Sequence, residues 1–290
     1  MLEITPIHII GVGKLGLPIA QVLKRAGHRV TVSDTAPLAE QHARDHGLPV
    51  VSAEDGIAAA SVILSSLPDD RALLAVGRQV AGLAGVGAVF VDTSTVSQAA
   101  SAQVARDCEA AGLPYLRCTV SGNGKMARAA QLTVLASGPR EVYVQLRPLL
   151  QTLGPAQFYL GDGEQARLMK LVVNLMIVQT SAMLAEALTL GRKGGLDWGD
   201  MWDVLSDSAV ASPILRAKAP QLRDRDFSPT FTVPQMIKDV DLMLAEGERC
   251  QAPLDQTRMT RQLLQRAIAL GMAEDDYASV IKVLESDAGL

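Results

Sequence analysis

The chain has 290 residues, 48% of them hydrophobic, and a formal net charge of −4 from 27 Lys and Arg against 31 Asp and Glu. This apolar content is enough for a sizeable core, and the length suggests about two domains of roughly 100–200 residues each. The slightly acidic balance, without a basic block, excludes an extended nucleic-acid footprint.

The cysteines and the apolar stretches indicate the cellular compartment of the protein and whether it binds a metal. Cys108, Cys118 and Cys250 lie far apart and form no CxxC pair. We therefore expect a reduced, cytoplasmic protein with no disulfide framework and no metal site. The N-terminal sequence lacks the features of a signal peptide, and the most apolar later stretch, 171–190, is interrupted by polar residues. We expect no membrane span.

From residue 6 to about 160, short apolar runs alternate with segments of helical spacing such as Leu17–Arg25 and Ala99–Ala111. This alternation predicts an α/β fold with a doubly wound parallel sheet of the Rossmann type and right-handed crossovers. The predicted strands are Ile7–Val12, Val30–Val32, Val62–Leu67, Ala88–Val91, Tyr115–Val120, Leu132–Ala136 and Gln157–Leu160.

After residue 162 the pattern becomes helical. Residues 164–193 contain one glycine and no proline, and Gly194-Gly195 then ends the run. This long helix is apolar around most of its circumference, so we expect it between domains or subunits. Further helices are predicted at Trp198–Ser206, Pro213–Ala219, Val233–Arg249, Gln256–Gly271 and Tyr277–Glu285.

These patterns predict three parts: a dinucleotide-binding domain (1–162), a long interdomain helix (163–195) and an all-helical domain for substrate binding or dimerisation (196–290). A monomer would expose a large apolar patch along the long helix. We therefore expect a homodimer or a homotetramer.

A glycine-rich loop, Gly11-Val12-Gly13-Lys14-Leu15-Gly16, follows the first predicted strand and opens a helix. In this pattern the first glycine permits the turn, the second lets a pyrophosphate approach the backbone, and the third allows close helix–strand packing. The loop therefore predicts a dinucleotide site. The alternative is a glycine-rich turn without a ligand, which the surrounding strand–helix alternation disfavours.

Asp34 follows the second predicted strand, 23 residues after Gly11. A carboxylate there can accept hydrogen bonds from the ribose 2′-hydroxyl and would repel a 2′-phosphate, so NAD is favoured over NADP. The next residue is Thr35 and not an arginine, although Arg29 and Arg44 are nearby in sequence. Alternatively, Asp34 only caps the following turn.

Four further segments follow in order: Asp92-Thr93-Ser94-Thr95, Val120-Ser121-Gly122-Asn123-Gly124, Lys170 with Asn174, and Lys238-Asp239 after Phe227–Phe231. Together with the glycine loop they resemble the β-hydroxyacid dehydrogenase family, the 3-hydroxyisobutyrate dehydrogenase and tartronate semialdehyde reductase group. The resemblance runs from about residue 6 to residue 286 and includes a C-terminal domain like that of 6-phosphogluconate dehydrogenase.

The resemblance implies a role for each matching position. It makes Lys170 the catalytic lysine with Asn174 as its helical companion, and places the substrate carboxylate on the Ser121-Gly122-Asn123 loop. Lys125, in the same loop, could add a charge for a second anionic group, although a solvated loop lysine is the simpler interpretation. The implied cofactor contacts, beside the glycine loop, are Leu67, Pro68, Ser94 and Lys238.

Some positions depart from the family pattern. Arg117-Cys118-Thr119-Val120 replaces the usual residues before the serine, Asn123 replaces a glycine, and only Asn174 remains of an asparagine pair. We expect these changes, grouped around the substrate loop at 117–123, to affect the identity of the substrate more than the reaction type.

The residues around Lys170 give an independent argument. Lys170 stands in an apolar segment, and desolvation disfavours a charged lysine. A lysine tuned toward neutrality can exchange a proton with a substrate hydroxyl. Asn174, four residues on, shares its helix face and adds no charge. The alternative is a lysine that extends from a long helix to solvent.

The sequence thus predicts an NAD(P)-dependent oxidoreductase that interconverts a small anionic β-hydroxyacid and its semialdehyde or keto acid, with Lys170 as general acid and base. Two alternatives remain: an imine or other carbonyl-analogue reductase on the same fold, whose members typically lack the lysine, and a non-catalytic NAD-binding scaffold. A 6-phosphogluconate-type activity would need a much larger helical domain than this chain has.

Overall fold

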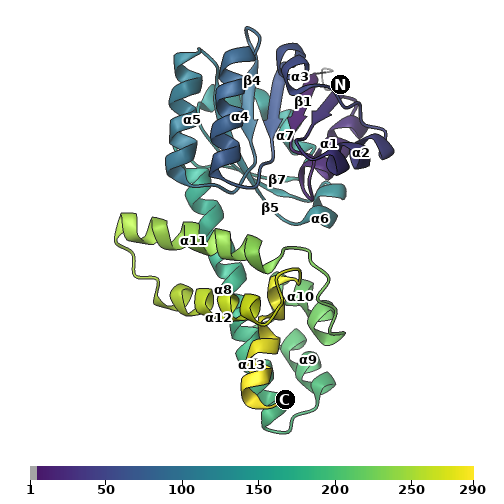
Figure 1. Ribbon diagram of the computed structural model, residues 1–290, viewed down its shortest axis with the longest axis vertical. Coiled ribbons are helices and arrows are strands. Elements are labelled where there is room, and N and C mark those ends of the chain that lie inside the picture. Colours follow the sequence, from purple (N-terminus) through teal and green to yellow (C-terminus); the bar gives the residue numbers. More distant parts are fainter. Residues whose placement is uncertain (1–4) are drawn as a thin grey trace. The chain divides into compact units, whose positions relative to one another are not determined.

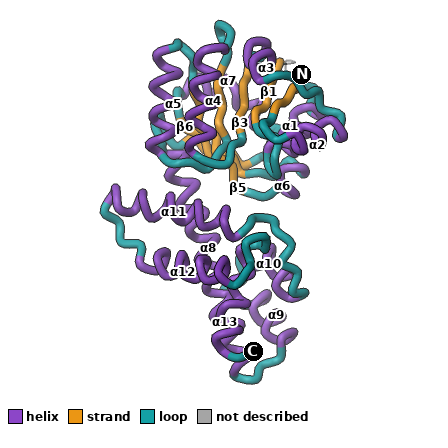
Figure 2. Tube along the Cα trace, viewed as in Figure 1, coloured by secondary structure: helices purple, strands orange, loops and turns teal. Residues whose placement is uncertain are grey.

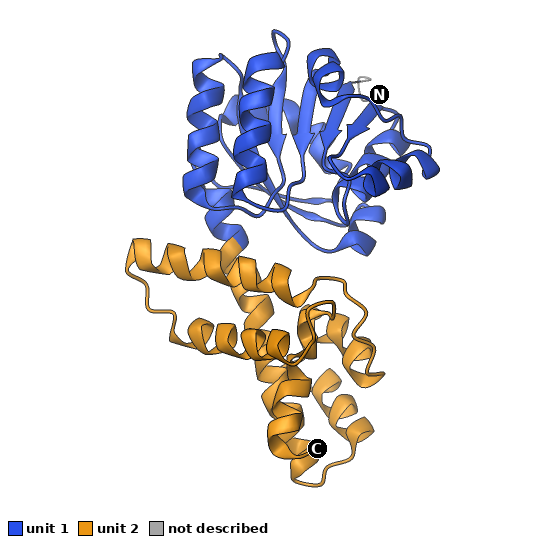
Figure 3. Cartoon of the chain, viewed as in Figure 1, with its two compact units in different colours: residues 1–170 blue, residues 171–290 orange. Residues whose placement is uncertain are grey.

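The computed structural model describes residues 5–290 (Figure 1). The chain forms two compact units, residues 1–170 and residues 171–290 (Figure 3). The division falls inside the long helix α8 (Gln165–Lys193), so the first turn and a half of α8 belong to unit 1 and the remainder belongs to unit 2.

Unit 1 contains one seven-stranded sheet in the order β2-β1-β3-β4-β5-β6-β7. Its strands are orange in Figure 2. All seven predicted runs form strands. Their bounds are Pro6–Ile10 (β1), Arg29–Ser33 (β2), Val62–Ser65 (β3), Val89–Asp92 (β4), Tyr115–Ser121 (β5), Thr133–Ser137 (β6) and Ala156–Tyr159 (β7). The strands are continuous apolar runs because helices cover both faces of the sheet, as parallel sheets require.

The predicted Rossmann-type sheet is confirmed as mostly parallel, with one antiparallel pair of strands. The pairs among β1 to β5 are parallel, but β5 and β6 are antiparallel, with Ser121 opposite Thr133. Only residues 122–132 connect these two strands, and a parallel crossover needs about a dozen residues or more. The sheet then continues with β7 parallel to β6.

The helices of unit 1 form two layers. Neighbouring residues of β1 and of β3 enter different hydrophobic clusters: Ile9 and Leu64 pack in one, Ile10 and Ile63 in the other. Several helices begin at a side-chain cap, as at Ser52 and Ser97. The helices are Gly16–Arg25 (α1), Pro37–Asp45 (α2), Ala53–Ala59 (α3), Asp70–Leu83 (α4), Gln98–Ala110 (α5), Gly124–Arg128 (α6) and Arg140–Gln151 (α7).

Unit 2 is all helical and has its own core. Val178 and Leu188 of α8 pack with Trp202, Val240 and Ile281. Every predicted helix is present. The helices after α8 are Trp198–Asp207 (α9), Pro213–Arg223 (α10), Val233–Cys250 (α11), Asp255–Ala269 (α12) and Val280–Ala288 (α13), with the short 3₁₀ turn Tyr277–Ser279 (η1) before the last.

By length and composition alone, α8 could cross a membrane, with a mean hydropathy of 1.6 over its most apolar window. Helices in the core of soluble proteins have the same composition, and 39% of that window is buried inside the chain. The helix also carries polar side chains at buried positions, namely Lys170, Asn174 and Ser181. Lipid-facing helices rarely carry such groups.

The buried histidine His8 lies on β1, the second strand from one edge of the sheet. The ring of His8 on β1 hydrogen-bonds Thr31 Oγ1 and Ser33 Oγ of β2, each at 3.0 Å. It packs so closely on α3 that a Cβ at Gly56 would lie 2.2 Å from the ring. Burial lowers the pKa of His8 to about 4, so the imidazole is neutral in the folded protein at pH 7.

We expect His8 to make unit 1 sensitive to acid. The unfolded chain binds a proton at His8 near pH 6.5 but the folded chain only near pH 4, so stability falls as the pH drops through this window. The loss should approach about 3 kcal/mol. The substitution His8→Gln should remove this part of the pH dependence.

Both tryptophans lie in unit 2, so their fluorescence would report the unfolding of that unit and not of unit 1. The test therefore follows hydrogen exchange of the peptide that contains β1 at increasing urea concentration, at pH 7 and at pH 4.5. The matched control is His46→Gln, at an exposed histidine of the same unit. If the wild type and the His8→Gln variant lose the same stability on acidification, His8 is not the source of the acid sensitivity.

Candidate active site

The predicted cofactor residues of unit 1 gather at the carboxyl edge of the sheet. The glycine loop follows β1, Asp34 follows β2, Leu67 follows β3 and Ser94 follows β4. The strand order reverses between β1 and β3, and a backbone hydrogen bond from Ser66 N to Ile10 O joins the two strand ends at 3.0 Å. Such a switch point is where open α/β sheets bind ligands.

The first and last glycines of the glycine loop are tightly packed, whereas the middle one faces open space. A Cβ at Gly11 would lie 2.4 Å from Ser66 O, and a Cβ at Gly16 would lie 1.9 Å from Gly11 O. At Gly13 nothing lies within 4 Å of the added Cβ. Helix α1 begins here without a side-chain cap and without an acidic residue in its first turn. This cradle fits a pyrophosphate at a helix N-terminus.

Asp34, which follows β2, hydrogen-bonds the backbone of the glycine loop. One carboxylate oxygen accepts from Val12 N at 2.8 Å and the other from Ala36 N at 2.9 Å. It therefore caps the following turn, and each oxygen still has a lone pair for a ribose hydroxyl. Arg44 pairs with Glu40 at 3.0 Å, and Arg29 stands at the opposite end of β2.

Ser94 and Leu67 are joined by a hydrogen bond. Ser94 Oγ accepts from Leu67 N at 2.8 Å and donates its proton to Asp92 Oδ1 at 2.6 Å. The Ser94 hydroxyl can thus only accept a bond from a ribose. Asp92 is fully buried and pairs with Arg167 of α8. Sequence reasoning assigned no role to Asp92 or Arg167.

The substrate loop begins at the end of β5. Ser121 is half-buried, and the Asn123 side chain caps α6 by accepting from Met126 N at 3.0 Å. Because the cap uses only the amide oxygen, the side-chain NH₂ and the backbone N–H of Asn123 remain as donors for a substrate carboxylate. A Cβ at Gly124 would lie 2.9 Å from Lys14 O, so this loop packs against the glycine loop. Lys125 is exposed on α6.

The departures at residues 117–120 lie in the strand that was predicted over Tyr115–Val120, and not in the substrate loop that follows it. They belong to the buried interior of β5. Arg117 Nε donates to Glu164 Oε1 at 2.9 Å, and Thr119 Oγ1 donates to Ala166 O at 3.0 Å. These side chains therefore fasten the start of α8 to the sheet, and the altered loop reduces to Ser121, Gly122 and Asn123.

Lys170 and Asn174 lie one turn apart on α8 and are both buried. Within unit 2, Asn174 Nδ2 donates to Asp239 Oδ2 of α11 at 2.7 Å. Asp239 is 1% exposed, and its other oxygen lies 2.8 Å from Lys238 Nζ. Because the amide NH₂ binds Asp239, the Asn174 carbonyl oxygen remains as an acceptor. Asp239 was missed as an orienting group; its place beside Lys238 was the only signal in the sequence.

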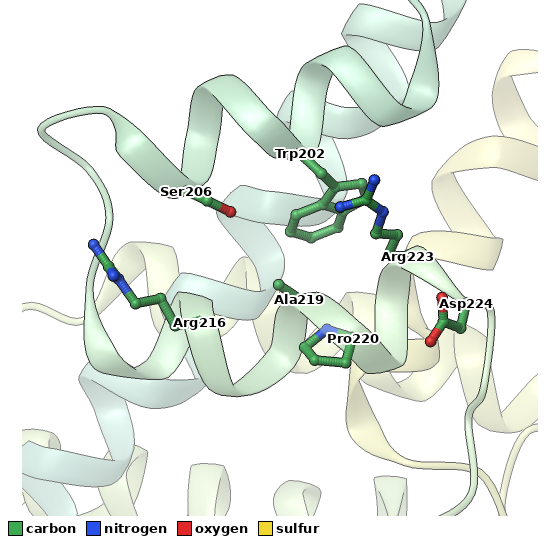
Figure 4. A pocket seen from close by; sticks show the side chains of 7 residues that line it. All are labelled: Trp202, Ser206, Arg216, Ala219, Pro220, Arg223 and Asp224. Carbon is green, nitrogen blue, oxygen red and sulfur yellow. The ribbon is translucent and has the colours of Figure 1, made fainter.

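A surface pocket of about 270 Å³ lies between α9 and α10 of unit 2 (Figure 4). No predicted site residue lines it. Its lining includes Trp202, Ser206, Arg216 and Arg223. Within residues 5–290, no group of three or more His, Cys, Asp or Glu side chains could hold a metal ion.

Comparison with known proteins matches both units. Residues 6–161 match the family described as the NAD-binding domain of 6-phosphogluconate dehydrogenase. Residues 164–284 match the one described as the NAD-binding domain of NADP-dependent 3-hydroxyisobutyrate dehydrogenase. The chain belongs to the β-hydroxyacid dehydrogenase family.

Individual members of the β-hydroxyacid dehydrogenase family align over nearly the whole chain. The 2-(hydroxymethyl)glutarate dehydrogenase of Eubacterium barkeri is 30% identical over 98% of this chain and 96% of its own. The structure of Mycobacterium tuberculosis 3-hydroxyisobutyrate dehydrogenase with L-serine is 26% identical, covers 97% and 99%, and gives a TM-score of 0.88. An imine reductase from Pseudomonas sp. shares the fold at 21% identity over 97% of this chain and 100% of its own, with a TM-score of 0.65.

Proposed function

We propose that this chain is an NAD(P)-dependent dehydrogenase that interconverts a small β-hydroxyacid and its semialdehyde or keto acid. The buried Lys170, one turn before a buried Asn174 on α8, carries the proposal. The names of two relatives, 2-(hydroxymethyl)glutarate and 3-hydroxyisobutyrate dehydrogenase, support this substrate class, because both acids bear a hydroxymethyl group on the carbon next to a carboxylate.

In the proposed reaction, Lys170 Nζ takes the proton that leaves the substrate hydroxyl and returns it to the carbonyl oxygen in the reverse direction. The Ser121 hydroxyl and the backbone at Gly122 and Asn123 hold the carboxylate. Asn174, oriented by Asp239, accepts a hydrogen bond on the helix face that carries Lys170. When bound, the nicotinamide supplies the centre that accepts the hydride or gives it back.

NAD is the proposed cofactor in preference to NADP. The Asp34 carboxylate stands beside the glycine loop with its remaining lone pairs available to ribose hydroxyls. Its negative charge disfavours a 2′-phosphate. Arg44, the first basic side chain after Asp34 other than histidine, is engaged by Glu40, and Arg29 stands at the opposite end of β2.

The proposed reaction is tested with purified protein, NAD or NADP, and a panel of small β-hydroxyacids, by the absorbance of the reduced cofactor. We expect turnover of at least one acid. Cofactor binding without turnover of any acid would contradict the proposal and favour a scaffold. Reduction of cyclic imines, with no turnover of an acid, would favour an imine reductase.

We also propose that the chain is a homodimer that pairs along α8. Val172, Met176, Met183 and Leu190 are exposed and recur at spacings of four and seven residues, which places them on one stripe of the helix. The other side of α8 is the core of unit 2. A second copy offers the same apolar stripe, so the pair is self-complementary.

We expect the double substitution Met176→Glu and Met183→Glu to convert the dimer into a monomer, because four like charges would meet in an apolar interface. Sedimentation velocity at micromolar protein measures the mass. The control is Val204→Glu, an exposed apolar position on α9. A wild type that sediments as a monomer, or a double variant of unchanged mass, would contradict this interface.

A further inference from the structure

Arg167 is a fully buried arginine one turn before Lys170 on α8. Its guanidinium donates from Nη2 to Asp92 Oδ2 at 2.5 Å and to the Tyr115 hydroxyl at 2.8 Å. Nη1 donates to the backbone oxygen of Ser94 at 2.7 Å, and Nε donates to Ser101 Oγ at 3.1 Å. Every edge of the planar group therefore has a partner in unit 1.

The network closes on predicted cofactor residues. Asp92 Oδ1 accepts from the hydroxyls of Ser65, at the end of β3, and Ser94, after β4. Ser94 in turn accepts from the backbone of Leu67. Arg167 thus binds both the Ser94 backbone and the carboxylate that orients its side chain. One continuous hydrogen-bond network thus joins the first turn of α8 to the ends of β3 and β4.

A contribution to folding stability does not by itself explain why the chain carries this buried network. A buried ion pair loses the hydration of both charges, and well-packed apolar residues often hold the same elements at least as well. Other bonds already fasten the start of α8, such as Ala166 N to Ser137 Oγ at 3.1 Å. Burial raises the pKa of Tyr115 to about 12, so its hydroxyl adds no second negative charge beside Asp92.

We propose that Arg167 is a positioning residue that, through Asp92 and Ser94, fixes Lys170 relative to the strand ends that carry the cofactor contacts. The inference rests on the proposed function, because it assigns Lys170 its reaction. The rigid guanidinium fork sets the direction of the helix turn, which a lysine, with a single flexible ammonium, cannot do. A displacement of about 1 Å at a reacting group can cost about 100-fold in rate.

The test uses Arg167→Lys and the double substitution Arg167→Gln with Asp92→Asn. Neither leaves an unpaired buried charge, so both should fold. We expect kcat to fall about 10- to 100-fold in each, with the KM for the acid and the dissociation constant of the reduced cofactor, read by its fluorescence, within about threefold of wild type. The pH dependence of kcat should also shift, since it reports the group that exchanges the proton.

The matched control is another buried pair, Lys218 with Asp276 in unit 2, whose Nζ and Oδ1 are 2.6 Å apart. The double substitution Lys218→Gln with Asp276→Asn should lower the melting temperature without changing kcat or its pH profile.

Two results would overturn the inference. One is full kcat and an unchanged pH profile in both Arg167 variants, or rescue of kcat by lysine. The other is a wild type that binds cofactor but turns over no acid, which identifies the proposed function itself as the failure.

Discussion

Replacing Lys170 by alanine is expected to lower kcat about 10²- to 10⁴-fold, the usual contribution of a general acid or base. Lys170→Arg should fail as badly, because an arginine stays protonated and cannot accept the hydroxyl proton. Reduced-cofactor absorbance under saturating acid and cofactor gives kcat. Cofactor fluorescence should give a nearly unchanged dissociation constant, which separates loss of chemistry from loss of binding.

The control for Lys170 is a lysine on the same helix. Lys193, at the exposed end of α8, donates to Ala288 O, and Lys193→Ala should leave kcat within about twofold. Addition of a small primary amine should restore part of the activity of Lys170→Ala, since the cavity left by the side chain can admit a free base. A Lys170→Ala enzyme with kcat within tenfold of wild type would remove the lysine from the mechanism.

The strands and helices could be predicted because their signals are local. Apolar runs such as Val62–Leu67, bounded by polar turns, predict buried strands wherever the partners lie. The direction of β6 could not be predicted from its own residues, which are as apolar as those of a parallel strand. The short connection after β5 held that information, and α6 inside it resembles a truncated crossover.

The candidate site was predictable where a motif has a fixed spacing. Gly11 to Gly16 and Asp34 lie within one β–α–β unit, so their distance in sequence fixes their distance in space. Arg167 and Asp92 are 75 residues apart, and Asn174 and Asp239 are 65 apart. Only the folded chain brings these pairs together. Both pairs place a charged side chain in the interior, where it must find a partner.

The residues at 117–120 illustrate the opposite error. They differ from the family pattern next to the substrate loop, and proximity in sequence favoured a functional interpretation. Their side chains alternate along β5, so Arg117 and Thr119 share a face and reach Glu164 and Ala166 at the start of α8. A change beside a loop can thus be a change in how the sheet holds the helix that carries Lys170.

Asp34 should decide the choice of cofactor, and its charge can be separated from its role in the loop. We expect the wild type to have a higher kcat/KM with NAD than with NADP. The substitution Asp34→Asn keeps the shape but loses an acceptor for one of the two backbone N–H groups. That loss loosens the loop equally for both cofactors, so it cancels in the ratio of their kcat/KM values.

The remaining effect on the ratio is electrostatic. Removal of the carboxylate charge beside a 2′-phosphate should shift the ratio toward NADP by about 10- to 100-fold, and Thr35→Arg should add to the shift by pairing with the phosphate. The control is Asp45→Asn, an exposed carboxylate on α2 that accepts from Gln41 at 2.8 Å. A wild type that prefers NADP, or a ratio that Asp34→Asn leaves unchanged, would reduce Asp34 to the cap that fastens Val12 and Ala36.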